Sequence, residues 1–280
     1  MTPTWIILPV MTGMEMTRAA ISDALAQSVP TRLLLVNQGC PDDMRDEFER
    51  LAEEQPERVF VLHHMPPLPS LSATWNRCLD LAWETGGEAA LVVNFDVRLA
   101  PDTVEMLAAA RRACDALFVS AVGVTGADFR QTSYEEREVG DVLANKGGPD
   151  FSCFLISKAC HDRFRFDEGF IPAFAEDLDM HRRLMLAGEG QRIFSVNLPF
   201  LHHASQTLKL LPPKEADRIR REIDTISRAH YRAKWGGDVN AETFLVPFGH
   251  ASDCVRTDGS AATPYLFDQE RQQWASALRT

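Results

Sequence analysis

Three acidic side chains in one short stretch are the first candidates for chemistry in this sequence. Glu176, Asp177 and Asp179 follow an aromatic loop over 170–174, and apolar residues at helical spacing come after them. A carboxylate in this position can act as a general base, because it can take a proton from a reacting hydroxyl group. The same pattern is also typical of an ordinary helix start, where unpaired N–H groups and the helix dipole favour acidic residues. On this stretch alone, the structural interpretation is the stronger of the two.

A second group of candidates could bind a metal ion. Asn94 and Asp96 end an apolar strand, and a carboxylate presented into a cleft can hold a divalent cation through oxygen. His202 and His203 end another apolar run and could supply an imidazole ligand to the same ion. Each feature also has a plain alternative, since a strand-end Asp is an ordinary turn former and paired histidines are commonly hydrogen-bonded structural residues.

The first half of the chain alternates short β-rich runs with amphipathic helical patterns. The expected strands cover 5–10, 32–37, 59–63, 90–95 and 117–124, and the expected helices cover 15–27, 42–54, 73–84 and 102–114. Continuous apolar strands that alternate with helices predict an α/β fold with a mainly parallel central sheet covered on both faces. Ligands bind at the carboxyl ends of the strands in such sheets, and Asn37 and Asp96 fall there.

The second half adds further strands and ends in a different kind of segment. Strands are expected over 151–156 and 191–197, on either side of the acidic helix, and a strongly charged helix over 212–233. Residues 126–150 are polar and lack periodicity, which predicts a surface loop, with a substrate lid as the less favoured option. The sequence therefore predicts a main domain over 1–205 and a helical and irregular C-terminal arm over 206–280, packed on the main domain or on a partner chain.

One short aromatic and basic patch lies in that arm. The segment YRAKWGG over 231–237 places Lys234 and Trp235 directly before two glycines. The favoured interpretation is a helix C-cap with a glycine terminus and a packed Trp. A contact with an acceptor or with a second copy of the chain is the alternative.

Composition limits the classes of function. The formal net charge is −11, which argues against broad electrostatic capture of nucleic acid or anionic membranes. No apolar run approaches the length of a membrane span, and the first residues lack the basic region of a signal peptide. The 6 cysteines form no CxxC pattern and read as reduced thiols. We therefore expect a cytoplasmic protein without integral membrane contact.

Five segments, taken in order, resemble a family 2 glycosyltransferase with the GT-A fold, a nucleotide-sugar-binding α/β domain. These segments are IILPVM with the helix and LLLVNQGC that follow it, SATWNRCLDLA, VVNFDVRLAPDTVEML, FDEGFIPAFAEDLDMHRRLMLAG and LHHASQT. The resemblance covers about 5–205. Any one segment would be unspecific, but the five occur in the family's order and spacing.

The resemblance implies an inverting transfer of a sugar from a nucleotide-diphosphate donor to an acceptor hydroxyl. Asp177 would be the general base, and Glu176 and Asp179 would orient groups or bind the acceptor. Asp96 would ligate Mn²⁺ or Mg²⁺, with His202 favoured over His203 as the late ligand. The metal would neutralise the charge that builds on the departing diphosphate. The donor would also contact Pro9, Val10, Asn37, Asn76 and Asn94.

Two residues depart from the family pattern, which carries Asp at both positions. Asn37 and Asn94 can accept a hydrogen bond as Asp does, but they also donate one and carry no charge. Asn37 therefore bears on the base preference, for which uracil is the family default, and Asn94 lowers the negative charge around the metal. The departures motivate the alternative of a catalytically silent nucleotide-sugar-binding protein. Retention of Asp96, Asp177 and the histidine pair favours an enzyme.

The acceptor is left open between a saccharide and a hydroxylated base in DNA, as in phages, where the protein would act in the host cytoplasm. A base flipped from the duplex needs stacking aromatics, and the candidates are Trp75, Phe129, Tyr134 and Phe174. The acidic net charge counts against a DNA acceptor. A homodimer is a further candidate assembly. A nucleotidyltransferase is rejected, because no Gly-rich, basic phosphate loop follows the first strand.

Overall fold

The computed structural model describes residues 3–124, 142–144 and 149–249. The chain divides into two compact units that alternate along the sequence. The sheet unit comprises 1–68, 74–161 and 191–212, and the helical unit comprises 69–73, 162–190 and 213–280. The boundary that we expect at residue 205 stays a prediction.

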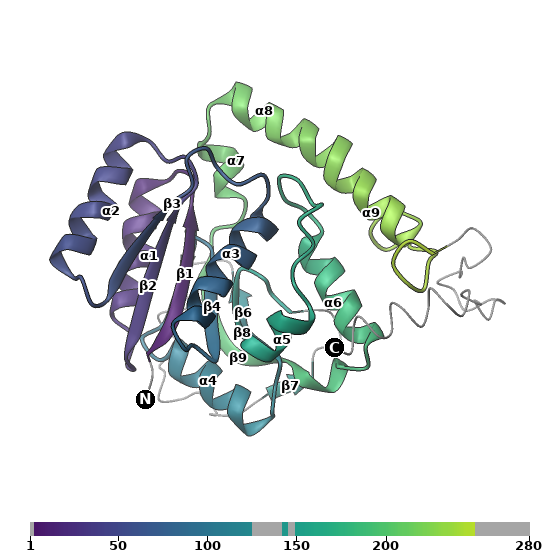
Figure 1. Ribbon diagram of the computed structural model, residues 1–280, viewed down its shortest axis with the longest axis horizontal. Coiled ribbons are helices and arrows are strands. Elements are labelled where there is room, and N and C mark those ends of the chain that lie inside the picture. Colours follow the sequence, from purple (N-terminus) through teal and green to yellow (C-terminus); the bar gives the residue numbers. More distant parts are fainter. Residues whose placement is uncertain (1–2, 125–141, 145–148, 250–280) are drawn as a thin grey trace. The chain divides into compact units, whose positions relative to one another are not determined.

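A mixed sheet forms the centre of the sheet unit (Figure 1). The strand order of this 9-stranded sheet is β3-β2-β1-β4-β8-β6-β9-β5 in the described residues, and β7 pairs with β9. Neighbours from β3 to β4 are parallel, as are β6 and β9, whereas β5, β7 and β8 run antiparallel to their partners. The bounds are β1 Thr4–Val10, β2 Thr31–Asn37, β3 Val59–His63, β4 Ala89–Val93, β5 Val97–Arg98, β6 Phe118–Val124, β7 Val142–Ala144, β8 Cys153–Ser157 and β9 Ile193–His202. The predicted α/β fold is confirmed.

Apolar side chains of the strands and of three helices form one core cluster of the sheet unit. Buried residues of β1 and β2 pack with α1 Met14–Leu25, α2 Asp42–Glu54 and α4 Thr103–Ala113 in one cluster. Ile6, Leu8 and Val10 alternate along β1, so they share the face that packs there. Further helices are α3 Leu71–Glu84, α5 Lys158–Arg163 and α7 Gln206–Leu210.

The helical unit contains α6 Glu176–Leu186 and a long helical run near the C-terminal end of the described chain. This run consists of α8 Pro213–Glu222, the π-helix η4 Ile223–Ser227 and α9 Arg228–Trp235, which follow one another directly (Figure 1). A short 3₁₀ helix, η3, covers Gly190–Arg192. Phe170, Ala175, Tyr231 and Trp235 form a small core of this unit.

The C-terminal end of α9 agrees with the favoured interpretation of the aromatic and basic patch. Gly236 follows Trp235 with φ of 75°, the left-handed conformation typical of a helix C-cap. Trp235 has 0% of its surface exposed, so it is a packed core residue. The helix C-cap prediction is confirmed.

Two parts of the predicted organisation differ from the structure. The strand expected over 191–197 is β9, which continues to His202 and so carries this histidine within the sheet. Within the expected loop over 126–150, β7 covers Val142–Ala144, and the loop's other residues up to 148 lie outside the described residues.

Among the described residues, no helix combines the length and the apolar character needed to cross a membrane.

Candidate functional site

Sheet pairing in the sheet unit brings together two predicted metal ligands that lie far apart in the sequence. The strand β5 begins directly after Asp96, and its Val97 lies opposite His202 in the antiparallel pair with β9. As a result, Asp96 Oδ1 lies 3.6 Å from His202 Nε2. The other oxygen of Asp96 accepts a hydrogen bond from the backbone N–H of Gln206 at 3.5 Å.

These contacts shift the pKa of both side chains in opposite directions. Burial tends to raise the pKa of Asp96, but the contact with His202 and the N–H of Gln206 outweigh it, and the net pKa is below its ordinary value. The pKa of His202 is raised, chiefly by its interaction with Asp96. In the absence of a metal, the pair therefore favours an ionised carboxylate beside a protonated imidazolium.

Ser152 fixes the orientation of His202. Its Oγ lies 3.1 Å from His202 Nδ1, so the Nε2 atom is the one that faces Asp96. A histidine that ligates a metal usually donates its other ring N–H to an oxygen, and Ser152 Oγ lies where it can accept such a bond. The side chain of His203 is exposed, while its backbone N–H donates to the Asp96 carbonyl at 3.0 Å.

The donor set suits a divalent ion that arrives with its substrate. No group of three His, Cys, Asp or Glu side chains that could hold a metal occurs among the described residues. Asp96 and His202 offer one carboxylate and one imidazole, which leaves further positions for diphosphate oxygens and water. Mg²⁺ is commonly bound in this way, through one or two carboxylates plus substrate phosphates. Asn94, which carries no charge, shapes the adjoining turn, where its carbonyl accepts the N–H of Val97 at 3.2 Å.

Three of the predicted donor-binding residues meet at the carboxyl ends of β1 and β2. Val10 lies opposite Asn37 in the parallel pair, and Pro9 precedes it. Asn37 is fully buried; its Oδ1 accepts the N–H of Cys40 at 2.7 Å, and its Nδ2 lies 3.0 Å from Nδ1 of His63. A carboxylate could accept from Cys40 but could not donate to His63. The departure from Asp at this position therefore has a local structural reason.

Asn76 and Trp75 are core residues of the sheet unit. Asn76 is 1% exposed, and its Oδ1 lies 3.2 Å from Nε2 of His161, whose other ring nitrogen accepts the indole N–H of Trp83 at 2.9 Å. Trp75 is 2% exposed and packs edge-on against Phe154. The expectation that Trp75 stacks on a base is wrong, because its ring faces lie in the core. Phe129 and Tyr134, proposed for the same role, lie outside the described residues.

The acidic helix α6 begins in the helical unit after a strained turn. Phe174 and Ala175 have φ of 96° and 70°, which is the left-handed region that residues other than glycine rarely adopt. Asp177 is partly buried, and its Oδ1 accepts the backbone N–H of Leu178 at 2.8 Å. Phe174, a candidate for stacking, is also partly buried.

Glu176 is more deeply buried than the adjacent Asp177. It is 6% exposed, and its Oε2 has no hydrogen-bond partner in the described part of the chain. Burial, and next the negative charge of Asp177, raise its pKa to about 8. Glu176 is therefore mainly neutral at pH 7.

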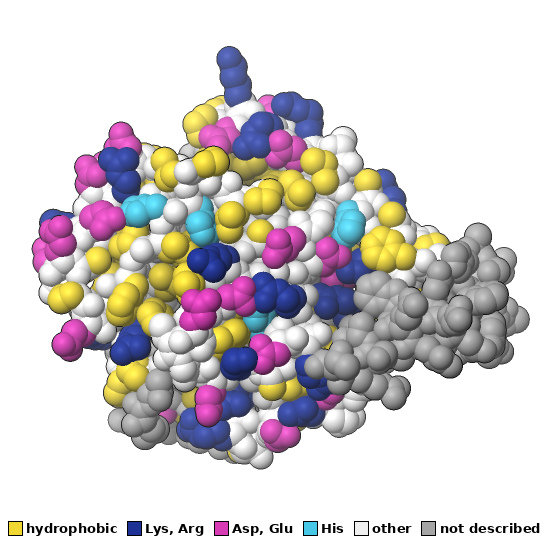
Figure 2. Space-filling model, viewed as in Figure 1, with side chains coloured by type: hydrophobic (Ala, Val, Ile, Leu, Met, Phe, Trp, Pro, Cys, Tyr) yellow, Lys and Arg dark blue, Asp and Glu magenta, His cyan; other side chains and the backbone are white. Residues whose placement is uncertain are grey.

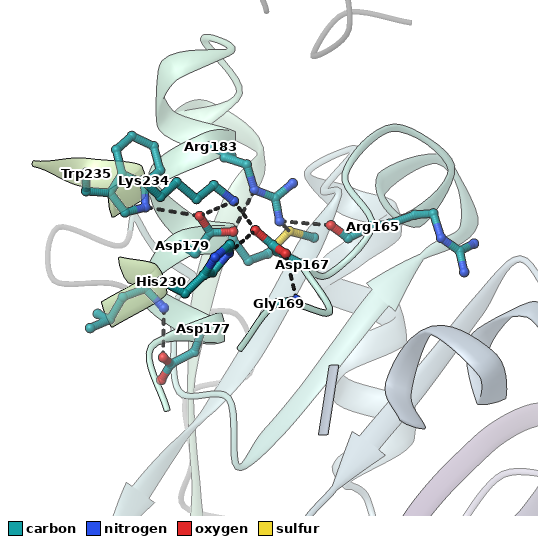
Figure 3. Close-up of polar contacts among 11 residues, drawn as sticks. Arg165, Asp167, Gly169, Asp177, Asp179, Arg183, His230, Lys234 and Trp235 are labelled. Atoms are coloured by element: carbon teal, nitrogen blue, oxygen red, sulfur yellow. Dashed lines mark hydrogen bonds and ion pairs between the residues drawn. The ribbon is translucent and has the colours of Figure 1, made fainter. Parts of the chain in front are cut away.

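Asp179 is fully buried and bound on both oxygens (Figure 3). It accepts hydrogen bonds from Nε of Arg183 at 2.8 Å and from the indole of Trp235 at 3.0 Å, and Nζ of Lys234 lies 2.7 Å away. Of the two roles expected for Asp179, this geometry favours orientation over contact with an acceptor. Sequence reasoning missed Ser152 and Lys234, although the compact patch around Trp235 pointed to the segment that contains Lys234.

The sequence matches no protein-family model, and it matches none of the curated proteins. Solved structures do resemble it. TarS from S. aureus has 15% identity and a TM-score of 0.53 over 83% of this chain and 45% of that chain. The TarS 1–349 structure in complex with UDP also has 15% identity and a TM-score of 0.53, and there the match covers 83% of this chain and 75% of that chain.

Two further similar structures are of enzymes that act on other substrates. The mannosyltransferase PcManGT from Pyrobaculum calidifontis, in complex with GDP-Man and Mn²⁺, has 15% identity and a TM-score of 0.56 over 85% of this chain and 76% of that chain. Glucosyl-3-phosphoglycerate synthase from Mycobacterium tuberculosis, in complex with Mn²⁺, UDP and phosphoglyceric acid, has 16% identity and a TM-score of 0.54 over 79% and 76%. The present chain therefore has the α/β fold of the GT-A glycosyltransferases.

Proposed function

We propose that this protein is a metal-assisted glycosyltransferase that moves a sugar from a nucleotide-diphosphate donor to a hydroxyl group. The observation that carries the proposal is the pairing of Asp96 with His202, which the register of β5 and β9 creates within a GT-A-like fold. A carboxylate and an oriented imidazole at this point suit a divalent ion that must also bind a diphosphate. Neighbours of the same fold were solved with Mn²⁺ and a nucleotide.

Mn²⁺ or Mg²⁺ would be held by Asp96 and His202, and it would supply Lewis-acid stabilisation of the leaving diphosphate. Ser152 would keep Nδ1 of His202 protonated, so that Nε2 stays free to bind the ion. Asn94 adds no negative charge, which suits an ion that binds together with the donor. Asn94, Pro9, Val10 and Asn37 complete the proposed donor side.

Asp177 would be the general base. It takes the proton of the acceptor hydroxyl as the acceptor oxygen bonds to the anomeric carbon of the sugar. The bond from that carbon to the diphosphate oxygen breaks, and the nucleoside diphosphate leaves with the electron pair. Attack from the face opposite the diphosphate inverts the configuration. Glu176 is neutral at pH 7 and would donate or accept a hydrogen bond without competing as the base.

We propose a UDP-sugar as the donor, in line with the UDP complexes of two structural neighbours, while the GDP-Man complex of the third makes GDP the first competitor. The acceptor would be a saccharide hydroxyl in preference to a DNA base. Figure 2 shows acidic and basic side chains interspersed over the visible face, outside the grey region. Duplex binding usually relies on a clustered basic surface.

The test is a thermal-shift panel of UDP-, GDP-, CDP- and dTDP-sugars, each with and without Mn²⁺. A ligand at about a hundred times its Kd stabilises by about 2.7 kcal/mol, which raises the melting temperature measurably. We expect a Mn²⁺-dependent shift with one nucleotide in the wild type and a much smaller shift in Asp96→Asn. The exposed Asp46→Asn variant on α2 is the matched control and should respond like the wild type.

Two results would count against the proposal. If no nucleotide sugar shifts the melting temperature, the donor site is absent. If one binds but wild-type protein releases no nucleoside diphosphate with any hydroxyl acceptor in a saccharide and oligonucleotide library, the catalytically silent binding protein is the better description. Homodimer formation is a separate question, which the sedimentation velocity of the same sample answers.

A further inference from the structure

The helical unit contains a buried ion-pair cluster that the proposed reaction leaves unexplained. Lys234, near the end of α9, is only 2% exposed. Its Nζ lies 2.5 Å from Oδ2 of Asp167 and 2.7 Å from Oδ1 of Asp179 (Figure 3). A buried ammonium group is retained only where its charge is matched, and here two carboxylates match it.

The two partners of Lys234 lie at opposite ends of one segment. Asp167 stands before the aromatic loop, Asp179 stands in the first turns of α6, and Asp177 lies between them. One ammonium group therefore ties together both ends of the segment that carries the proposed base.

Asp167 and Asp179, the two carboxylates bridged by Lys234, each make further contacts. Asp167 also accepts hydrogen bonds from Nε2 of His230 at 2.9 Å and from the N–H of Gly169 at 2.9 Å. Although burial tends to raise the pKa of Asp167, the hydrogen bond from His230 and the charge of Lys234 hold it below its ordinary value. Asp179 is bound by Arg183 and Trp235 as described above. The buried carboxylate of Asp179 and the half-buried carboxylate of Asp167 thus face two cations, Lys234 and Arg183, so the formal charges of these four groups balance.

The segment 167–179, whose two ends Lys234 bridges, contains strained backbone conformations. The left-handed conformations of Phe174 and Ala175 directly precede α6. Such conformations persist only where the surrounding structure holds them, and they are common at functional sites. The C-terminal helical run supplies that support: Oγ of Ser227 donates to the carbonyls of Ile171 at 2.9 Å and Ala173 at 2.7 Å, and the guanidinium of Arg228 lies 4.3 Å from the ring centre of Phe174.

We infer that Lys234 is a positioning residue for the proposed transfer: by bridging Asp167 and Asp179, it fixes the strained turn that directly precedes the helix carrying Asp177. The inference rests on the proposed function, because it names the device that holds that reaction's base. Lys234 does not touch the reacting atoms in this proposal. It acts on turnover only through the placement of the acidic helix.

The test compares Lys234→Met with a charge-balanced variant. Lys234→Met leaves Asp179 with Arg183 and removes the lysine partner of the half-buried Asp167. Lys234→Met combined with Asp167→Asn restores the balance, since Asp179 then faces Arg183 alone. Lys214→Met removes an exposed lysine from α8 and is the matched control. The measurements are melting temperature, Kd for UDP with Mn²⁺, kcat and KM, and amide hydrogen exchange of peptides that cover 167–179.

Lys234→Met should lower kcat by about tenfold or more, because a displacement of about 1 Å in a catalytic group can cost about 100-fold in rate. Its Kd for UDP with Mn²⁺ should stay close to wild type, because Asp96 and Asn37 belong to the sheet unit. The double variant should recover the melting temperature but neither kcat nor slow exchange over 167–179. Lys214→Met should match the wild type in every measurement.

Recovery of kcat together with the melting temperature in the double variant would reduce Lys234 to a purely structural residue and overturn the inference. Unchanged exchange over 167–179 in both Lys234 variants would overturn it as well. If the wild type transfers no sugar, the proposed function fails on its own. The exchange measurement then still decides whether Lys234 holds the acidic segment.

Discussion

Asp177 and Glu176 are neighbours in the sequence, but their side chains lie in different surroundings. Asp177 is partly exposed, whereas Glu176 is buried beside it with a pKa raised to about 8. We expect Asp177→Asn to lower kcat by about 10²–10⁴-fold, the usual contribution of a general base. Donor binding should stay within about twofold of the wild type, because the amide keeps the same shape. Steady-state kinetics and UDP titration measure both quantities, and wild-type turnover in this variant would remove Asp177 as the base.

Glu176 should make stability fall with rising pH. Its folded pKa is about 8, against an ordinary value of 4.5, so the unfolded chain releases this proton at a lower pH than the folded chain does. The stabilising contribution is therefore complete below about pH 4.5 and is lost as pH rises through about 8. Each unit of pKa shift corresponds to about 1.4 kcal/mol, so the loss is of the order of a few kcal/mol.

Glu176→Gln keeps the neutral form at every pH and should flatten this slope. We expect its melting temperature at pH 9 to exceed that of the wild type, with little difference at pH 5. The exposed Glu53→Gln variant on α2 is the control for general charge effects. A wild-type melting temperature that does not fall between pH 5 and 9, after comparison with this control, would show that Glu176 ionises normally.

At the scale of the elements, three strands are needed to orient one histidine. The antiparallel pair of β4 and β8 places Val93 opposite Cys153, and the Asn94 N–H donates to the Ser152 carbonyl at 3.0 Å. This brings Ser152 to the edge where β9 ends at His202. We expect Ser152→Ala to weaken Mn²⁺-dependent UDP binding by about 10–100-fold, as losses of such supporting hydrogen bonds do. Isothermal titration with Mn²⁺ present measures this affinity.

His203→Ala is the control, because the exposed side chain of His203 can be removed without changing the backbone N–H that meets Asp96. It should bind UDP and Mn²⁺ as the wild type does. If His203→Ala loses binding and Ser152→Ala keeps it, the ligand is His203 and the orientation by Ser152 is irrelevant.

Local pattern predicts the elements far better than it predicts their contacts. The helix over 42–54 and the strand over 59–63 have the expected bounds, because amphipathic and β-rich periodicity is complete within each segment. The strand β5, only two residues long, and the continuation of β9 to His202 depend on pairing with distant strands. For the same reason, the sequence does not predict the roles of Ser152 and Lys234, because their hydrogen-bond and ion-pair partners lie far away in the sequence. Candidate site residues could be named from the sequence, but not the groups that hold them.

At the scale of the whole molecule, net charge bears on the choice between the two acceptor classes. The chain carries 40 acidic and 29 Lys or Arg side chains, which gives the formal charge of −11. Affinity for duplex DNA depends on cations that neutralise phosphates, and it falls steeply between about 50 and 200 mM salt when several contacts form. An acidic protein that transfers sugar to saccharides should show neither strong duplex binding nor that salt dependence.

We therefore expect fluorescence anisotropy with a labelled duplex that contains hydroxymethylated bases to detect no saturable binding at about 150 mM salt. A saccharide acceptor should meanwhile support release of nucleoside diphosphate from the donor identified in the thermal-shift panel. Saturable duplex binding with a steep salt dependence, together with sugar transfer to the modified base, would establish the DNA acceptor instead. In that case, a local groove of basic side chains must bind the DNA phosphates although the protein as a whole is acidic.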